Sequence, residues 1–352
     1  MKYLHFSILL LALTLCACGN GATNSEKSEK DSAKVELPDL VGDSALTNAA
    51  KFYADKVDAT FTNQRLAVVD SMVKTDMSDM QEKCKFAFYP FGGPDFLYPH
   101  HIFPNADTYF LMGLERPGTA PSTIEPNKVF LYANSLRDYL NASFYVTKNM
   151  KVDLATKDID GALPLIAMLM AKDSCQIISV KYKDFDDKGN MKEADKTVAC
   201  LAEVEFFSNA TPKHKQTLYF YSGNTNDAYF SPGLKAYLTK TLKKEQVATF
   251  LKAASYLMHC PGFDTIRNFI VDNSFAILED DSGVPYRYFD KSKWDFTLYG
   301  TYIRPLMVFT DACVQPDLDA LYKQQAAAGK VKPMPLRIGY NNPSNWMVAR
   351  KK

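Results

Sequence analysis

Residues 175–207 read CQIISVKYKDFDDKGNMKEADKTVACLAEVEFF and contain the clearest pair of strands in the chain. Two runs, at 175–182 and 200–207, are rich in the branched and aromatic residues that strands favour. The residues Asp187-Lys188-Gly189-Asn190 lie between these runs and are typical of a turn. This stretch therefore predicts a β-hairpin and antiparallel pairing. Cys175 and Cys200 begin the two strands, which places them at opposite ends of a simple hairpin, so a disulfide between them is not expected.

Apolar periodicity on either side of the hairpin predicts further elements, which come in groups and do not alternate regularly. We expect strands near 85–91, 108–114, 175–184, 197–207, 216–222, 284–289, 295–303, 335–340 and 345–350, and helices near 44–74, 128–145, 161–171, 232–243, 245–258, 263–272 and 317–328. No internal repeat and no Pro- or Ser-rich linker divides residues 40–352. The sequence therefore predicts a single compact α+β domain, with a largely antiparallel sheet and flanking helices.

The composition sets limits on the class of protein and on its partners. The 352 residues are 47% hydrophobic and 23% charged, which is typical of a chain that buries a core and excludes a disordered or coiled-coil protein. The 41 basic and 40 acidic residues nearly cancel. A neutral chain has no electrostatic reason to bind a polyanion, so we expect no nucleic-acid partner.

Residues 1–18, MKYLHFSILLLALTLCAC, have the features of an export signal. Lys2 precedes an apolar run at 6–15, which is too short to span a bilayer as a helix. The segment ends in Leu15-Cys16-Ala17-Cys18, which resembles the lipobox of bacterial lipoproteins. The resemblance covers these residues only and implies removal of residues 1–17 and lipidation of Cys18. Cys16 is the less suitable acceptor because Leu15 would then occupy the position before the cut.

Residues 18–39 contain almost no apolar side chains, so we expect a flexible, disordered tether between the lipid anchor and the domain. Cys18 is not followed by Asp, and no acidic block lies beside it. In the lipoproteins of Gram-negative bacteria these features indicate the outer membrane and its periplasmic face. The resemblance thus implies a cell-envelope protein that contacts the membrane through an N-terminal lipid anchor.

The most unusual segment of the body is residues 88–104, FYPFGGPDFLYPHHIFP, with four prolines, a glycine pair and two adjacent histidines. Such a stiff segment can hold side chains in a fixed array. Asp95, His100, His101 and Glu115 are the candidate catalytic or metal-ligating residues, because imidazole and carboxylate groups are the usual general bases and zinc ligands. Alternatively, the segment is an aromatic-packed connection whose histidines bind backbone groups. Adjacent histidines on an extended chain point apart, which disfavours a shared ion.

A second set of candidates suits stacking on a glycan or a peptide, because it combines aromatic and guanidinium groups. These candidate binding residues are Tyr98, Tyr286, Arg287, Tyr299, Tyr302 and Arg304. The alternative is that they belong to the core, since the chain has 20 Tyr and 23 Phe. The run Asp280-Asp281-Ser282-Gly283 is most simply a turn.

Motifs leave the activity open. The sequence has no HExxH, GxSxG, Walker or GxGxxG motif, so zinc-protease, serine-hydrolase and nucleotide-binding functions have no motif support. The block Tyr89-Pro-Phe-Gly-Gly-Pro-Asp95, together with 281–287 and 298–302, resembles a family of uncharacterised bacterial exported proteins over about residues 85–350. That resemblance implies no activity and no cofactor.

Three functional hypotheses follow from these observations. The first is an envelope lipoprotein that binds a glycan, a peptide or a protein partner. The second is a periplasmic hydrolase that uses the 88–104 segment, with or without a divalent metal. The third is a structural or assembly subunit of an envelope complex.

Overall fold

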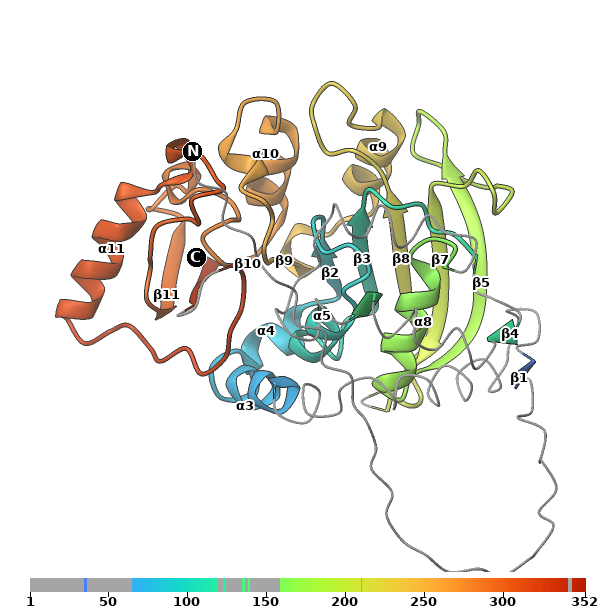
Figure 1. Ribbon diagram of the computed structural model, residues 1–352, viewed down its shortest axis with the longest axis horizontal. Coiled ribbons are helices and arrows are strands. Elements are labelled where there is room, and N and C mark those ends of the chain that lie inside the picture. The colour runs from blue at the N-terminus through green and yellow to red at the C-terminus, as the bar shows by residue number, and fades with distance from the viewer. Residues whose placement is uncertain are drawn as a thin grey trace, which may run out of the picture. The chain divides into compact units, whose positions relative to one another are not determined.

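The computed structural model describes residues 35–36, 65–119, 123–124, 135–136, 139, 159–209, 211–340 and 344–352 (Figure 1). Lys34–Lys352 form one compact unit. The strands are β1 (Val35–Glu36), β2 (Phe86–Tyr89), β3 (Thr108–Gly113), β4 (Thr123–Ile124), β5 (Gln176–Phe185), β6 (Met191–Glu193), β7 (Leu201–Phe207), β8 (Gln216–Ser222), β9 (Val247–Leu251), β10 (Ala276–Glu279), β11 (Trp294–Gly300) and β12 (Asn345–Lys351). The helices are α3 (Ala67–Asp76), α4 (Ser78–Lys83), α5 (Leu97–Ile102), α8 (Leu163–Lys172), α9 (Pro232–Thr241), α10 (Asp264–Asn273) and α11 (Pro316–Ala327).

Ten of the described strands form one mixed sheet in the order β11-β12-β10-β9-β2-β3-β8-β7-β5-β6. Five of its nine strand pairings are antiparallel and lie at the two ends of the sheet. The other four join β10, β9, β2, β3 and β8 into a parallel centre. The expected α+β class, with a mostly antiparallel sheet and flanking helices, is confirmed, and β5 pairs with β7 as the hairpin stretch predicts.

Each face of the sheet is covered by its own set of helices. Successive side chains of a strand point to opposite faces, and β2 shows the consequence. Its Ala87 and Tyr89 pack with α3, α5 and α8, whereas its Phe86 and Phe88 pack with α9, α10 and α11. Because both faces are buried, the central strands are mainly apolar and do not alternate regularly with polar residues.

The connections that follow the neighbouring strands β2 and β9 cross opposite faces of the sheet. After β2, the helix α5 crosses on the α3/α8 face to reach β3, whereas after β9, α10 crosses on the other face to reach β10. In open sheets, the point where connections diverge in this way leaves a crevice beyond the carboxyl ends of the strands, and ligands bind there. In this fold the crevice lies between the residues that follow β2 and those that follow β9.

Three expected elements are wrong, and burial explains the most important one. The helix expected at 245–258 is the strand β9 followed by a 3-10 turn at Leu257–His259. All five side chains of β9 are buried, and a short continuous apolar run can be a buried strand or a helix. The strand expected at 284–289 is a 3-10 turn at Tyr286–Tyr288, and residues 335–340 form no strand.

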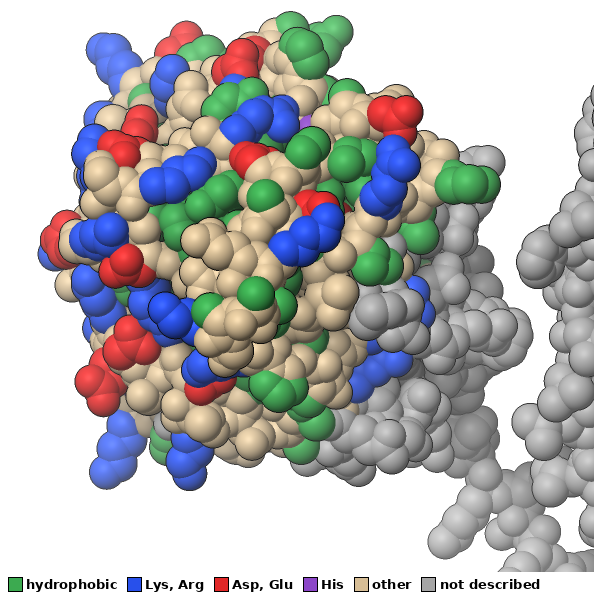
Figure 2. Space-filling model, turned by 90° about the vertical axis from the view of Figure 1, so that its left-hand side faces the viewer, with side chains coloured by type: hydrophobic (Ala, Val, Ile, Leu, Met, Phe, Trp, Pro, Cys, Tyr) green, Lys and Arg blue, Asp and Glu red, His purple; other side chains and the backbone are tan. Residues whose placement is uncertain are grey.

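Several expectations lie outside the described residues. These are the signal segment with Cys18, the tether up to residue 34, helix residues 44–64 and most of 128–145. Among the described helices, none is both long and apolar enough to cross a bilayer. Figure 2 views the side where α11 lies, and there basic and acidic side chains of the described residues are interspersed, as the balanced composition suggests.

Candidate functional site

A pocket of about 230 Å³ lies at the carboxyl ends of β2, β3, β8 and β9, in the crevice where the connections diverge. This volume is several times the roughly 30 Å³ that one water molecule occupies in the liquid. Aromatic side chains, a few polar groups and bare backbone line the pocket, among them Tyr89, Phe91, Phe263, Glu115, Asn224 and Lys252. A concave, mainly apolar wall with a few convergent polar groups is typical of a ligand site.

A buried ion pair bridges the crevice. Asp95, which follows β2, lies with its Oδ2 2.9 Å from Nζ of Lys252, the first residue after β9, and both side chains are 1% exposed. The hydroxyls of Tyr89 and Tyr139 donate to the Asp95 carboxylate at 3.1 and 2.6 Å. The Lys252 ammonium lies 4.2 Å from the ring centre of Tyr98, close enough for a cation–π contact. A buried charge is costly unless it is paired and hydrogen-bonded, and this pair is both.

The burial of Lys252 also changes its acidity. Removal from water disfavours the charged amine and lowers the pKa of Lys252, while the neighbouring Asp95 carboxylate acts in the opposite direction. Lysines in such surroundings are common at functional sites, although ion pairs with a structural role show the same pattern. The pocket position of Lys252 distinguishes it from a purely internal pair.

Glycines let the backbone itself form part of the pocket wall. A Cβ on Gly92 would lie 2.4 Å from the ring of Tyr89, so the ring packs directly on the bare backbone. A Cβ on Gly113 would lie 2.8 Å from Oε2 of Glu115 and 3.2 Å from the Cα of Gly93. Any side chain at these positions would displace the aromatic ring or the carboxylate that lines the pocket.

The segment after Lys252 is strained and held from behind. Ala253, Ser255 and Tyr256 have φ values of 51°, 54° and 54°, a region that residues with a side chain seldom adopt. The backbone N–H of Ala253 donates to Oδ2 of Asp280 at 3.0 Å, and the N–H of Ala254 donates to Oγ of Ser282 at 2.7 Å. Strain of this kind persists only where surrounding contacts impose it, and it concentrates at functional sites.

Asp280 and Asp281, the two residues after β10, support this segment, and Glu279 is the last residue of the strand. Glu279, Asp280 and Asp281 are almost fully buried. Burial raises the pKa of all three, and for Asp280 burial together with the charge of Asp281 raises it to about 7. Asp281 accepts a hydrogen bond of 2.6 Å from the hydroxyl of Tyr256. Residues 280–283 form the expected turn, and their side chains also support the pocket wall from behind.

We expect Asp280→Asn to gain stability relative to the wild type as the pH rises from about 4 to about 7. The unfolded Asp280 ionises near 3.8, whereas the folded one keeps its proton up to about 7. Its stabilising contribution is therefore complete below pH 4 and is lost as the pH passes through 7. Asn mimics the protonated form and loses nothing over this range. Urea denaturation of both proteins across these pH values measures the difference.

The difference between the two proteins is the quantity to compare, because another buried group acts in the opposite sense. Burial lowers the pKa of His259 from 6.5 to about 4, so its contribution is complete above pH 6.5 and is lost as the pH falls. His259 is common to both proteins, and its effect cancels in the difference. A difference that does not change with pH would contradict the assignment of a proton to Asp280.

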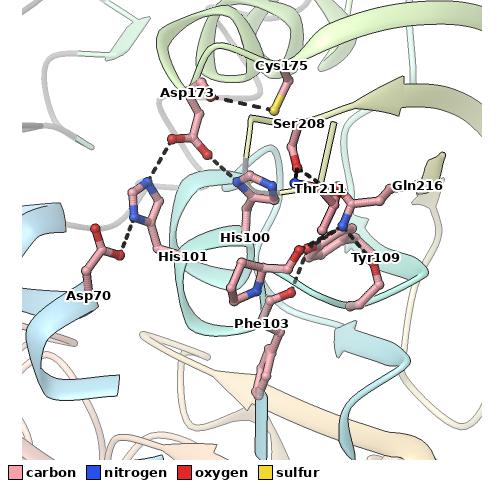
Figure 3. Close-up of polar contacts among 12 residues, drawn as sticks. Asp70, His100, His101, Phe103, Tyr109, Asp173, Cys175, Ser208, Thr211 and Gln216 are labelled. Atoms are coloured by element: carbon pink, nitrogen blue, oxygen red, sulfur yellow. Dashed lines mark hydrogen bonds and ion pairs between the residues drawn. The ribbon is translucent and has the colours of Figure 1, made fainter. Parts of the chain in front are cut away.

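The two adjacent histidines belong to a different cluster, shown in Figure 3. They lie on α5, a short helix within the segment expected to be extended. Nδ1 of His101 lies 2.6 Å from Oδ1 of Asp70, and its Nε2 lies 2.9 Å from Oδ1 of Asp173. Nδ1 of His100 contacts the other oxygen of Asp173. Asp173 thus lies between the two imidazoles.

The charges in this cluster stabilise each other. Burial alone would lower the pKa of His101, but hydrogen bonds to Asp173 and Asp70 outweigh it and raise the pKa to about 10. Burial likewise opposes ionisation of Asp173, but the two histidines hold its pKa well below the usual range. A ring with both nitrogens on carboxylates is protonated, so His101 is an imidazolium cation in this arrangement.

The structure divides the four catalytic candidates between the two places. Asp95 and Glu115 line the pocket, whereas His100 and His101 lie with Asp173 and Asp70 and are not part of its wall. The four side chains therefore do not form one catalytic array. The carboxylates that reach the imidazoles come from α3 and from the end of α8.

The candidates for stacking do not form an exposed aromatic surface. Tyr98 lies against Lys252 in the core, while Arg287 and Arg304 are exposed, and Arg304 pairs with Asp311 at 2.9 Å. The other three candidates are buried: Tyr286, Tyr299 and Tyr302. These three tyrosines are therefore core residues, as the alternative interpretation expected.

Lys252, Asp280 and Asp173 are the residues that the sequence reasoning missed. Lys252 lies within the stretch expected to be helical, where a lysine is ordinarily solvated. A signal was present, because a lysine directly after a mainly apolar, buried five-residue strand lies at the carboxyl edge of the sheet. Asp173 follows an apolar helix in the sequence and gives no comparable signal.

Comparisons of this chain with protein-family models, with curated proteins and with solved structures found no match. The function is therefore inferred from the chemistry of the site.

Proposed function

We propose that this protein binds a compact polar ligand, of the size of a single sugar residue, in the pocket between β2 and β9. The observation that carries the proposal is the position of the pocket, at the carboxyl edge where the connections from β2 and β9 leave on opposite faces. The Asp95–Lys252 pair crosses the same crevice. The fold thus supplies a crevice, and the sequence lines it with charged groups that are costly to bury.

The lining indicates the chemistry of the ligand. Tyr89, Phe91 and Phe263 offer apolar faces, and Glu115 and Asn224 offer acceptors for hydroxyl or amino protons. The Lys252 ammonium is paired with Asp95, and the carboxylate of Glu115 also lines the pocket, so repulsion between like charges disfavours an anionic ligand. Hydroxyl-rich rings with an apolar face combine these properties, and we therefore assign the ligand to the saccharides.

The proposed setting is the bacterial cell envelope. The signal segment and Cys18 support a lipoprotein held at the outer membrane by its lipid, with the domain on the periplasmic side. Envelope glycans are the natural source of saccharide ligands there. Under this proposal the domain is a binding module, and hydrolysis of the bound glycan is a separate outcome of the test below.

Titration calorimetry of the full protein in detergent, with neutral and amino monosaccharides and with free amino acids, tests the proposal. We expect saturable binding of a saccharide and a rise in Tm, about 2.7 kcal/mol of added stability at a hundred times Kd. Glu115→Gln should weaken binding ten- to hundredfold, because a hydrogen bond to a charged group contributes about 1.5–3 kcal/mol. Glu193→Gln, a change of an exposed glutamate on β6, should leave Kd unchanged.

Two results would contradict the proposal. One is an absence of binding by every saccharide in a protein whose near-UV circular dichroism shows a folded core. The other is equal affinity of the wild type and Glu115→Gln. Release of a new reducing end when the protein is incubated with an oligosaccharide would instead identify the hydrolase hypothesis as the correct one.

A further inference from the structure

The cluster around Asp173 contains a second set of groups, which the pocket does not use. One ring nitrogen of His100, one carboxylate oxygen of Asp173 and Sγ of Cys175 lie within 4.8 Å of one another. His100 and Cys175 are buried, and Asp173 keeps a side-chain exposure of 16%. Nitrogen, oxygen and sulfur donors thus converge at one place beneath the surface, with access from solvent on the Asp173 side.

The backbone at the end of α8 accounts for this convergence. Ser174, between Asp173 and Cys175, has a φ of 56°, which is unusual for a residue other than glycine. The N–H of Ser174 donates to the carbonyl of Ala171 at 3.0 Å, and the N–H of Cys175 donates to that of Met170 at 2.8 Å. These two bonds form a Schellman motif, which ends the helix. The turn brings Asp173 and Cys175 to the same side, towards His100 on α5 (Figure 3).

The donors in this cluster are incompletely used by the protein. Nε2 of His100 is buried and has no hydrogen-bond partner among the residues that the structure describes. Sγ of Cys175 makes only a weak contact of 3.9 Å with the carbonyl of Asp173, and its own side chain is buried. Buried polar atoms are ordinarily paired, so an unpartnered imidazole nitrogen in this cluster calls for an explanation.

We propose that His100, Asp173 and Cys175 bind a zinc ion. Zinc takes imidazole nitrogen at about 2.0–2.1 Å, carboxylate oxygen at about 2.0–2.2 Å and thiolate sulfur at about 2.3 Å, in tetrahedral geometry. The thiolate disfavours magnesium and calcium, which take oxygen ligands, and the carboxylate disfavours copper(I), which takes soft ones. Three protein donors leave a fourth position for water or a ligand.

His101 has a supporting part in the proposed site. Its Nε2 contacts Oδ1 of Asp173, and its Nδ1 contacts Asp70. When the ion binds, the contact between Asp173 and His100 is replaced by bonds from both residues to the metal. The proton on Nδ1 of His100 then moves to Nε2 of the same ring, and the thiol proton of Cys175 is released to solvent. Asp173 keeps its contact with His101, an arrangement in which a second residue orients a ligating carboxylate.

Zinc binding is measured on the full protein in detergent after treatment with a chelator, with zinc chloride added and a chromogenic chelator as competitor. We expect one zinc per chain. Cys175→Ser should weaken binding by at least about 100-fold, since even the loss of an orienting residue costs 10–100-fold. Cys260→Ser is the matched control, because Cys260 is a free, half-buried thiol outside the cluster. Its affinity for zinc should equal that of the wild type.

Cobalt chloride provides an independent readout. Cobalt(II) in the site should give a near-ultraviolet thiolate charge-transfer band, which is absent in Cys175→Ser and present in Cys260→Ser. If Cys175→Ser does not fold, as judged by near-UV circular dichroism, Asp173→Asn takes its place for the affinity measurement. Binding below one equivalent, or unchanged affinity in these variants, would overturn the assignment. Neither result depends on whether the pocket binds a saccharide.

Discussion

Lys252→Met should lower the free energy of unfolding by about 3–5 kcal/mol, the usual cost of removing one member of a buried ion pair. The variant leaves the Asp95 carboxylate inside the protein with only the hydroxyls of Tyr89 and Tyr139 as hydrogen-bond partners. Methionine fills much of the volume of the lysine stem, so the loss comes mainly from the uncompensated charge and from the lost contact with the Tyr98 ring. Urea denaturation followed by fluorescence measures the change.

A double-mutant cycle separates the pair from its surroundings. Asp95→Asn removes the charge and keeps an acceptor for one tyrosine, so Lys252→Met combined with Asp95→Asn should cost less than the sum of the single changes. Lys323→Met is the control, because Lys323 pairs with Asp319 at 2.6 Å on an exposed face of α11. That pair should contribute only about 0.3–0.5 kcal/mol. Additive single changes at Lys252 and Asp95 would show that the two charges do not stabilise each other.

Cys18→Ala should move the protein from the membrane fraction to the soluble fraction of the envelope. Under the lipoprotein proposal the acyl chains on Cys18 are the anchor, at about 0.8 kcal/mol for each buried CH₂ group. Two or more chains make the attachment effectively permanent, so the change in distribution should be almost complete. Fractionation and incorporation of labelled palmitate measure it.

Cys16→Ala is the matched control for the anchor. Cys16 lies two residues before Cys18, and alanine at this position is also a small residue, which the lipobox accepts there. Palmitate incorporation and membrane attachment should therefore be retained. Loss of the label in Cys16→Ala with retention in Cys18→Ala would reverse the assignment. Attachment of both variants without any label would refute lipidation as the anchor.

The antiparallel parts of the sheet could be predicted because their evidence is local. The residues of β5 and β7, with a turn between them, carry their own pairing signal, and β8 and β12 lie close to the expected ranges. Strands were also expected at β2 and β3, but the parallel pairing at the centre of the sheet was not, because parallel neighbours come from distant parts of the chain. Because both faces of β9 are buried, its sequence does not alternate between apolar and polar residues, and it could not be distinguished from part of a helix.

The site shows the same limit at the level of single residues. Asp95 and Glu115 were found because a stiff segment and an adjacent strand end carry unusual chemistry. The partner of Asp95 is Lys252, which only the order of the strands brings across the crevice. Likewise, the histidines were found from sequence, but Asp173 and Cys175 reach them through a turn whose αL residue is a serine, not the glycine that usually marks it.

The divergence of the connections from β2 and β9 also affects the order in which the protein can assemble. The two strands are hydrogen-bonded neighbours, yet β3, α8 and the whole β5–β8 region lie between them in the chain. A chain that crosses a membrane from its N-terminus presents β2 long before β9. One edge of β2 must therefore wait without its native partner, and such edges readily pair with the wrong strand. The pocket thus forms late in folding. Under the proposal of an exported envelope protein, the time before β9 arrives is the period in which periplasmic chaperones would matter most.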